Sequence, residues 1–157
     1  MARKRDKLAA PVVKWVGGKR QLLEAFGPLL PKRIPVYCEP FLGGGALLFH
    51  LQPSVAYVND VNGELINLYQ VIQREVDALV EELRSYRNEA EFFYSVRDWD
   101  RDPQAYAQLS PVKRAARIVY LNKTCYNGLF RVNSSGEFNT PFGHYKNPNI
   151  VNEEGLR

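Results

Sequence analysis

Three features of this 157-residue sequence predict an α/β protein with a parallel sheet. Two short runs of β-type residues, 36–38 and 55–58, are each followed within two residues by an acidic side chain. A glycine-rich turn and an apolar helical stretch at 43–51 separate the two runs, and a long amphipathic segment follows the second. The order strand, helix, strand, helix is typical of parallel sheets, because a parallel connection needs a crossover element.

The composition excludes several classes of protein before any motif is considered. The chain is 45% hydrophobic and 24% charged, which is ordinary for one soluble domain. Cys38 and Cys125 lie far apart and only two histidines are present, so we expect no disulfide scaffold, no zinc framework and no other metal. No apolar run approaches the roughly 18 residues of a membrane span, and the apolar stretch before Lys14 is too short for a signal peptide. We therefore expect a cytoplasmic protein without a membrane partner.

Charge is distributed unevenly along the chain, although the net charge is only +4. Residues 1–7 hold four basic side chains and one acid, which predicts a flexible basic arm. Residues 74–102 hold five arginines against nine acids. Of these acids, we expect Glu75, Asp77, Glu81 and Glu82 to form a solvent-facing helix surface with no catalytic role. Residues 110–146 hold six Lys or Arg against one acid, so this block is the candidate surface for a nucleic acid.

Two helices and a hairpin are predicted in the second part of the chain. After Asn62, apolar residues from Leu65 to Leu83 recur at spacings of three and four, which keeps them on one helix face. A second helix is predicted over 112–124. Beyond it, the polar residues 133–136, which include a glycine, lie between two β-type runs and indicate a β-hairpin.

The turn after the first strand has the composition of a ligand-binding turn. Glu39 ends the strand, and glycines at 43–45 precede a helix whose backbone N–H groups can meet a ligand. A dinucleotide fingerprint needs a third glycine where Leu48 stands, which disfavours a nicotinamide-dependent oxidoreductase. The two acids instead suit a nucleoside with a zwitterionic tail, with Asp60 accepting from ribose hydroxyls. For either motif alone, a tight turn beside a helix-capping acid is the alternative.

Four motifs, in this order and spacing, resemble those of the Dam-like family of DNA adenine methyltransferases. They occupy residues 11–20, 39–46 and 59–62, and the paired segments 126–131 and 138–143. These bacterial and phage enzymes transfer a methyl group from S-adenosylmethionine to the exocyclic amine of adenine, typically in GATC. The resemblance covers nearly the whole chain and implies a Rossmann-like fold, an S-adenosylmethionine cofactor and double-stranded DNA as a partner.

The resemblance also implies which residues form the cofactor pocket. These residues are Trp15, Lys19, Glu39, Phe41, Gly43, Gly45 and Asp60. Glu39 and the glycines would hold the methionine end of the cofactor, and Asp60 would hold the ribose. The alternative for Trp15 is a core side chain in an exposed loop that precedes a helix.

The segment 126–146 resembles the DNA-reading hairpin of the family, which enters the major groove, where all four base pairs are distinguishable. The DNA contacts implied by the resemblance are Lys14, Asn127, Leu129, Arg131, Pro141 and His144. Arg131 would grip a guanine edge with its planar fork, and Asn127 would fill the space of the extruded base. His144 stands where family members often have arginine.

Basic residues also recur in the helix predicted before this hairpin. Lys113 and Arg117, with Arg114, are spaced so that they can lie on one helix face and follow phosphates. A solvated helix face is the alternative. For the hairpin itself, the alternative is a purely structural role in which it stabilises the fold and Arg131 faces solvent.

The catalytic motif of the family is not in this chain. An adenine amine is a poor nucleophile, and the family flips the base and polarises the amine with an Asp-Pro-Pro-Tyr tetrapeptide. The nearest strings, at 102–104 and 59–61, lack the second proline and the aromatic residue. We therefore expect the front part of a methyltransferase, either a fragment or one subunit of a split enzyme whose second polypeptide brings the tetrapeptide.

These observations divide the chain into four parts. Residues 1–7 are the basic arm, 8–73 a partial Rossmann-like S-adenosylmethionine domain, 74–147 the helical and β-hairpin DNA-recognition region, and 148–157 a return to the methyltransferase domain. Two other functions stay open at this point. One is a non-catalytic DNA- or cofactor-binding module derived from such an enzyme, and the other is a nicotinamide-dependent oxidoreductase.

Overall fold

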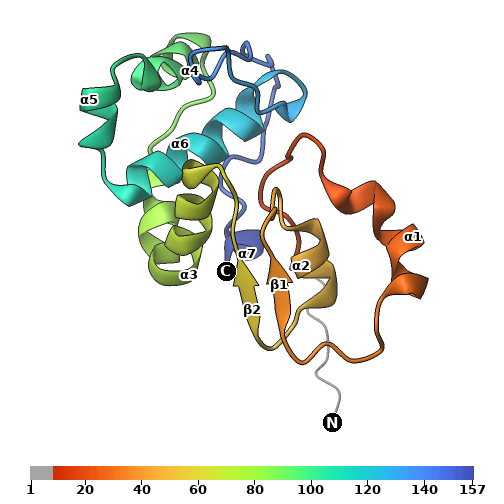
Figure 1. Ribbon diagram of the computed structural model, residues 1–157. Coiled ribbons are helices and arrows are strands. Elements are labelled where there is room, and N and C mark those ends of the chain that lie inside the picture. The colour runs from red at the N-terminus through yellow and green to blue at the C-terminus, as the bar shows by residue number, and fades with distance from the viewer. Residues whose placement is uncertain (1–8) are drawn as a thin grey trace.

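The computed structural model describes residues 9–157, as a small parallel sheet beside a larger group of helices (Figure 1). The predicted basic arm at 1–7 lies outside the described residues. Strands β1 (Tyr37–Glu39) and β2 (Ala56–Val58) pair in parallel, and helix α2 (Ala46–Leu51) connects them. This arrangement confirms the parallel α/β pattern predicted from the sequence. No helix among residues 9–157 has the length and apolarity needed to cross a membrane.

The N-terminal segment reaches the sheet through a short helical stretch. Helix α1 (Leu23–Phe26) lies between two 3-10 turns, Lys19–Leu22 and Gly27–Leu29, and contacts α2. Figure 1 shows α1 beyond α2, on the side of the sheet opposite to α3 and α6. No residue of α1 or of the two 3-10 turns is buried, so these elements add nothing to the buried core.

The helical part begins with α3 (Gly63–Arg84), which packs along α6 (Pro111–Thr124) in the most extensive pairing of the fold. The helix begins after Asn62, as predicted, and Asn62 caps it, because its side-chain oxygen accepts the Leu65 N–H at 3.1 Å. The predicted apolar stripe is buried, although non-helical dihedral angles at Glu75 interrupt the helix. Between and after these helices lie shorter elements: α4 (Ala90–Arg97), the 3-10 turn Asp98–Arg101, α5 (Pro103–Ala107), the 3-10 turn Tyr126–Gly128 and α7 (Glu153–Leu156).

The hairpin predicted over 130–139 is present only as isolated antiparallel bridges, without regular strands. Val132 pairs with Phe138, and Cys125 pairs with Phe142. Phe138 and Phe142 are both buried, and the Phe142 ring lies 5.3 Å from the ring of Phe93 on α4. Because these rings are anchored in the helical core, the segment follows the core surface and does not form an independent two-stranded ribbon.

Candidate functional site

The glycine turn between β1 and α2 brings several predicted residues into contact. The Gly43 N–H donates to Asp60 Oδ2 at 2.8 Å, which joins the turn to the segment after β2. A Cβ on Gly43 would lie 3.3 Å from Cδ1 of Trp15, so the indole rests directly on the turn. Gly43 and Gly45 also have φ values of +55° and +72°, a region that side chains other than glycine rarely adopt. Glycine at 43 therefore lets the backbone lie this close to Trp15, whereas glycine at 45 avoids the Phe49 ring, whose Cε2 would lie 2.9 Å from a Cβ.

A charged network fixes the end of β1. The Glu39 carboxylate is buried and accepts from Lys19 Nζ at 2.9 Å and from the Tyr37 hydroxyl at 2.6 Å. Lys19 Nζ also donates to the Phe41 carbonyl oxygen, whereas the Phe41 ring is exposed. Burial and the neighbouring Glu39 carboxylate raise the pKa of Tyr37, so its hydroxyl remains a donor. All seven predicted cofactor residues thus surround one turn, with Phe41 contributing its backbone to the network.

A buried tyrosine hydroxyl in this region lacks a hydrogen-bond partner among residues 9–157. The Tyr69 hydroxyl, on α3, is shielded from solvent, and a Cβ on Gly45 would lie 3.4 Å from it. Burial and the charges of Glu39 and Asp60 raise the pKa of Tyr69. Buried polar groups are nearly always satisfied, so this hydroxyl is an unusual unpaired donor beside the glycine turn. Sequence patterns did not single it out, because Tyr69 fits the apolar stripe of α3.

Each carboxylate oxygen of Asp60 can accept a further hydrogen bond. One oxygen accepts the Gly43 N–H and the other accepts the Asn62 N–H at 3.0 Å. Each carboxylate oxygen offers two lone pairs, so one on each oxygen is available to a ligand. A nearby cavity of about 560 Å³ is lined by Trp15, Gly44, Lys123 and residues of the N-terminal segment, and its size suits a small molecule. Asp60 and Tyr69 are not among the residues that line this cavity, so the remaining lone pairs of Asp60 suit hydroxyl or amine groups of a ligand that extends beyond it.

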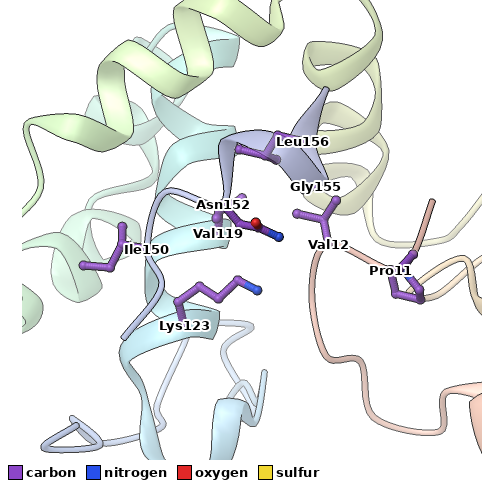
Figure 2. Close-up of a pocket in the computed structure, with 9 residues that line it drawn as sticks. Pro11, Val12, Val119, Lys123, Ile150, Asn152, Gly155 and Leu156 are labelled. Carbon is purple, nitrogen blue, oxygen red and sulfur yellow. The ribbon is translucent and has the colours of Figure 1, made fainter. Parts of the chain in front are cut away.

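Lys123 is a basic residue that the sequence analysis did not select. Figure 2 shows Lys123, from α6, extending into a small cavity that it shares with Asn152 and Val12. This cavity, of about 50 Å³, is too small for a nucleoside. Burial and the nearby Lys14 lower the pKa of Lys123. Because Lys123 also lines the larger cavity, it adds positive charge beside Lys14 and Trp15.

The segment predicted to read DNA lies against the N-terminal loop. The rings of Trp15 and Phe130 stack with centroids 4.7 Å apart. The Tyr126 N–H donates to the Pro141 carbonyl oxygen at 2.9 Å, which pairs the two predicted motifs of this region. Figure 1 shows this blue segment at the end of α6, beside the red N-terminal loop. Among the predicted DNA contacts, Leu129 is half-buried. The others are exposed: Lys14, Asn127, Arg131, Pro141 and His144.

Arg131 is held in a definite direction. Its Nε donates to the Asn139 side-chain oxygen at 2.8 Å, and the Asn139 N–H donates to the Arg131 carbonyl oxygen at 3.0 Å. The side chain is exposed, and its terminal amino groups have no partner among residues 9–157. These two groups are the ones that grip a guanine edge.

The prediction that Lys113 and Arg117, with Arg114, follow phosphates along one face of α6 is wrong for the two arginines. Arg117 is only 3% exposed, and its guanidinium pairs with Asp100 at 2.7 Å and donates to the carbonyls of Val96 and Arg97. Arg114 pairs with Glu64. Helical spacing places these residues on one face of α6. Because α4 and α3 pack against that face, Arg117 and Arg114 form ion pairs within the protein and are not available to phosphates.

Lys113 differs from Arg117 because it stays partly exposed. Its ammonium lies 5.4 Å from the centre of the Trp99 ring. Lys113 is in the first turn of α6, whereas the DNA-reading segment follows the last turn. At 1.5 Å per residue the two ends of this helix are roughly 20 Å apart. The structure therefore does not bring Lys113 together with the other predicted DNA contacts.

The fold and the site define a class of protein. A parallel sheet whose glycine turn bonds to the acid after the next strand is typical of enzymes that bind a nucleoside-type cofactor, and here an exposed basic segment adjoins it. The family description "D12 class N6 adenine-specific DNA methyltransferase" matches residues 15–157, and the chain belongs to this family. The family predicted from the sequence motifs is thereby confirmed, and it is a family of enzymes.

Several curated relatives are similar to this chain. It is 43% identical to the type II methyltransferase M.MjaIII of Methanocaldococcus jannaschii, over 94% of this chain and 56% of the relative. It is 46% identical to the type II methyltransferase M1.LlaDCHI of Lactococcus lactis, over 92% of this chain and 51% of the relative. The DNA adenine methylase of Escherichia coli K12 is 38% identical over 87% of this chain and 48% of its own length. The chain thus spans about half the length of the relatives it matches.

Proposed function

We propose that this chain binds S-adenosylmethionine and reads DNA for a site-specific adenine methyltransferase whose target is GATC. One observation carries the proposal. Trp15 contacts the glycine turn with its indole and stacks on Phe130 of the DNA-reading segment, so one side chain joins the two predicted sites. A methyltransferase needs this proximity, because the cofactor's methyl group and the target base must meet within bonding reach.

The residues around the turn have definite roles in this proposal. S-adenosylmethionine supplies the activated methyl group when it is bound. Asp60 accepts from the ribose hydroxyls with its remaining lone pairs, and the Tyr69 hydroxyl gains a partner. Glu39 and Lys19 present opposite charges to the zwitterionic methionine end, beside the turn glycines.

The DNA-reading segment would approach the major groove. Arg131, oriented by Asn139, donates its two terminal amino groups to a guanine edge. Asn127 has a φ of +56° at the tip of its turn and is exposed, which suits a side chain that enters the space of a flipped base. Leu129 and Pro141 offer apolar contacts for a thymine methyl group, and Lys14 and His144 face the duplex from either side of the turn.

The sheet supports a further polypeptide as a partner. Parallel sheets are normally covered on both faces, yet all three residues of β2 are exposed, with Tyr57 67% exposed. Within residues 9–157, β1 pairs only with β2, so its other edge offers unpaired backbone groups. In this proposal, additional strands cover β1 and bring the Asp-Pro-Pro-Tyr tetrapeptide to the cavity beside Trp15 and Lys123. Residues 74–147 then form the DNA-recognition region and 148–157 return toward those strands.

Methyl transfer tests the proposal. The chain is incubated with labelled S-adenosylmethionine and a GATC duplex, alone and with the part of the lactococcal relative that it does not match. We expect label in DNA only when both polypeptides are present, and none in a duplex whose adenines are replaced within the site. Equal transfer to an unrelated duplex would contradict the GATC target. Binding of cofactor and DNA without transfer would favour the alternative of a non-catalytic module.

A further inference from the structure

A buried asparagine on α6 ties two functional segments together. Asn122 is only 3% exposed and is close to the end of this helix. Its side-chain oxygen accepts the Lys14 N–H at 2.9 Å. Its amide nitrogen donates to the Lys14 carbonyl oxygen at 2.8 Å and to the Gly128 carbonyl oxygen at 3.0 Å. One side chain therefore bonds to the backbone of both the N-terminal loop and the DNA-reading turn.

The chemistry of this contact admits only one orientation of the amide. An asparagine side chain offers two N–H donors and one acceptor oxygen. The Lys14 N–H requires the oxygen, and the two carbonyls require the nitrogen, so both donors are used. A flipped amide would oppose like groups in all three contacts. No shorter or purely apolar residue can satisfy both backbone segments at once, and buried backbone groups without partners are costly.

The contact is also tight sterically. A Cβ on Gly128 would lie 2.9 Å from Cδ of Lys14 and 3.2 Å from the Asn122 carbonyl oxygen. Gly128 also has a φ of +64°, which glycine tolerates without strain. The stacked rings of Trp15 and Phe130 add a second contact between the same two segments. Backbone bonds, side-chain packing and ring stacking thus hold the loop and the turn at one fixed separation.

We propose that Asn122 is a positioning residue that sets the distance between the cofactor pocket and the DNA-reading turn. The roles of the two segments rest on the proposed function, whereas the tie between them does not. Lys14 and Trp15 are on one side of the tie, and Asn127 is on the other. With the tie broken, the turn moves independently of the pocket, and the enzyme loses base discrimination.

The decisive variant is Asn122→Asp. It keeps the acceptor for the Lys14 N–H but turns a carboxylate oxygen toward two carbonyl oxygens. Burial raises the pKa of such a carboxyl, so acidification to pH 5.5 restores a proton that can bond one carbonyl. Asn67→Asp is the matched control, because the Asn67 amide also donates to a backbone carbonyl, that of Pro111, outside both segments.

Two readouts separate the tie from the function it serves. In hydrogen exchange corrected for intrinsic rates, Asn122→Asp at pH 7.5 should lose at least tenfold protection in both 13–18 and 125–131, with α3 unchanged. Its preference for GATC over a singly altered duplex should fall about tenfold at pH 7.5 and recover at pH 5.5, while Asn67→Asp and the wild type stay constant. Opening of neither segment, or of only one, overturns the proposal, as does unchanged discrimination.

Further outcomes keep the two proposals distinguishable. If the wild type discriminates between no duplexes, the proposed function fails, but the exchange result still decides whether Asn122 ties the segments. If Asn122→Asp does not fold, Gly128→Ala tests the same contact, since its methyl group displaces the Lys14 side chain. We expect Gly128→Ala to open the same two segments and lower discrimination. Unchanged protection of both segments in Gly128→Ala, or opened segments with unchanged discrimination, would contradict the positioning role.

Discussion

The helical part of this protein buries its large apolar side chains, whereas the sheet part leaves several of them exposed. In the helical part, Tyr120, Phe93 and Phe138 are fully buried, and their rings contact other rings of the same core. In the sheet part, Tyr57, Val58 and Phe41 are exposed, although strands of a parallel sheet are normally covered. The difference shows that the helices supply their own core, while the sheet part leaves large apolar side chains exposed.

The largest expected effect is on the stability of the helical part. Arg117→Ala removes a buried cation that pairs with Asp100 at 2.7 Å and leaves Arg101, at 2.8 Å, as the cationic partner of this carboxylate. Because Asp100 keeps the Phe138 N–H, we expect a loss near the lower end of the range for broken buried pairs, about 3 kcal/mol. Urea unfolding measures this loss. Arg114→Ala, at a partly exposed pair, is the control and should cost at most about 1 kcal/mol; similar costs for both variants would contradict the burial difference.

The two cysteines compare the two parts directly. Cys38, on β1, is exposed, and Cys125, at the end of α6, is buried. Burial raises the pKa of Cys125 to about 11, so little thiolate is present at pH 8, and access is blocked as well. With a chromogenic disulfide at pH 8, Cys38 should react at least about a hundredfold faster. In urea the two rates should become equal, and a protected Cys38 in the native chain would mean that the sheet is already covered.

A smaller effect is expected in the DNA-reading segment. Arg131→Ala should remove two hydrogen bonds to one guanine, which costs about 1 to 3 kcal/mol of discrimination at that position. Competition binding with duplexes altered at each base pair measures the effect. Asn139→Ala, which frees the Arg131 Nε, should give a partial loss at the same position. A uniform loss on every sequence would assign Arg131 to phosphate contact.

The smallest effect is expected for Lys113. Because its ammonium lies over Trp99 at the far end of α6, Lys113→Ala should leave the salt dependence of DNA binding unchanged. Lys14→Ala, in the exposed loop beside the turn, is the matched comparison and should lower the slope of log K against log salt by about 0.9 for one lost phosphate contact. A drop in slope for Lys113→Ala would restore the phosphate role predicted from the sequence.

Local sequence signals predicted the elements that depend on local chemistry. The start of the long helix after Asn62, the helix at Ala46–Leu51, both strands and the helix ending at Thr124 agree with the structure to within one or two residues. The break at Glu75 and the short helices α4 and α5 were not predicted, because tertiary contacts and short segments leave weak periodicity. Asp102 does cap α5 with two hydrogen bonds, so one usable signal was overlooked.

The site was predictable where residue type carries the chemistry. Motif spacing led to the glycine turn and Asp60, and the structure brings them together. Periodicity failed for Arg117, because it cannot distinguish a solvent face from a face covered by another helix. Asn122 and Tyr69 were not singled out by any pattern, since Asn122 bonds to Lys14, 108 residues away, and the Tyr69 hydroxyl lies beside the distant Gly45.

Binding of labelled S-adenosylmethionine by equilibrium dialysis, with and without a GATC duplex, is the most direct test of the central claim. That claim is that Asp60 and the glycine turn form a cofactor pocket, and that the adjoining DNA-reading segment does not itself bind the cofactor. We expect Asp60→Ala to weaken cofactor binding at least about tenfold, a loss of roughly 1.4 kcal/mol, and to leave DNA affinity unchanged. Undiminished cofactor binding by Asp60→Ala would overturn this assignment of the pocket.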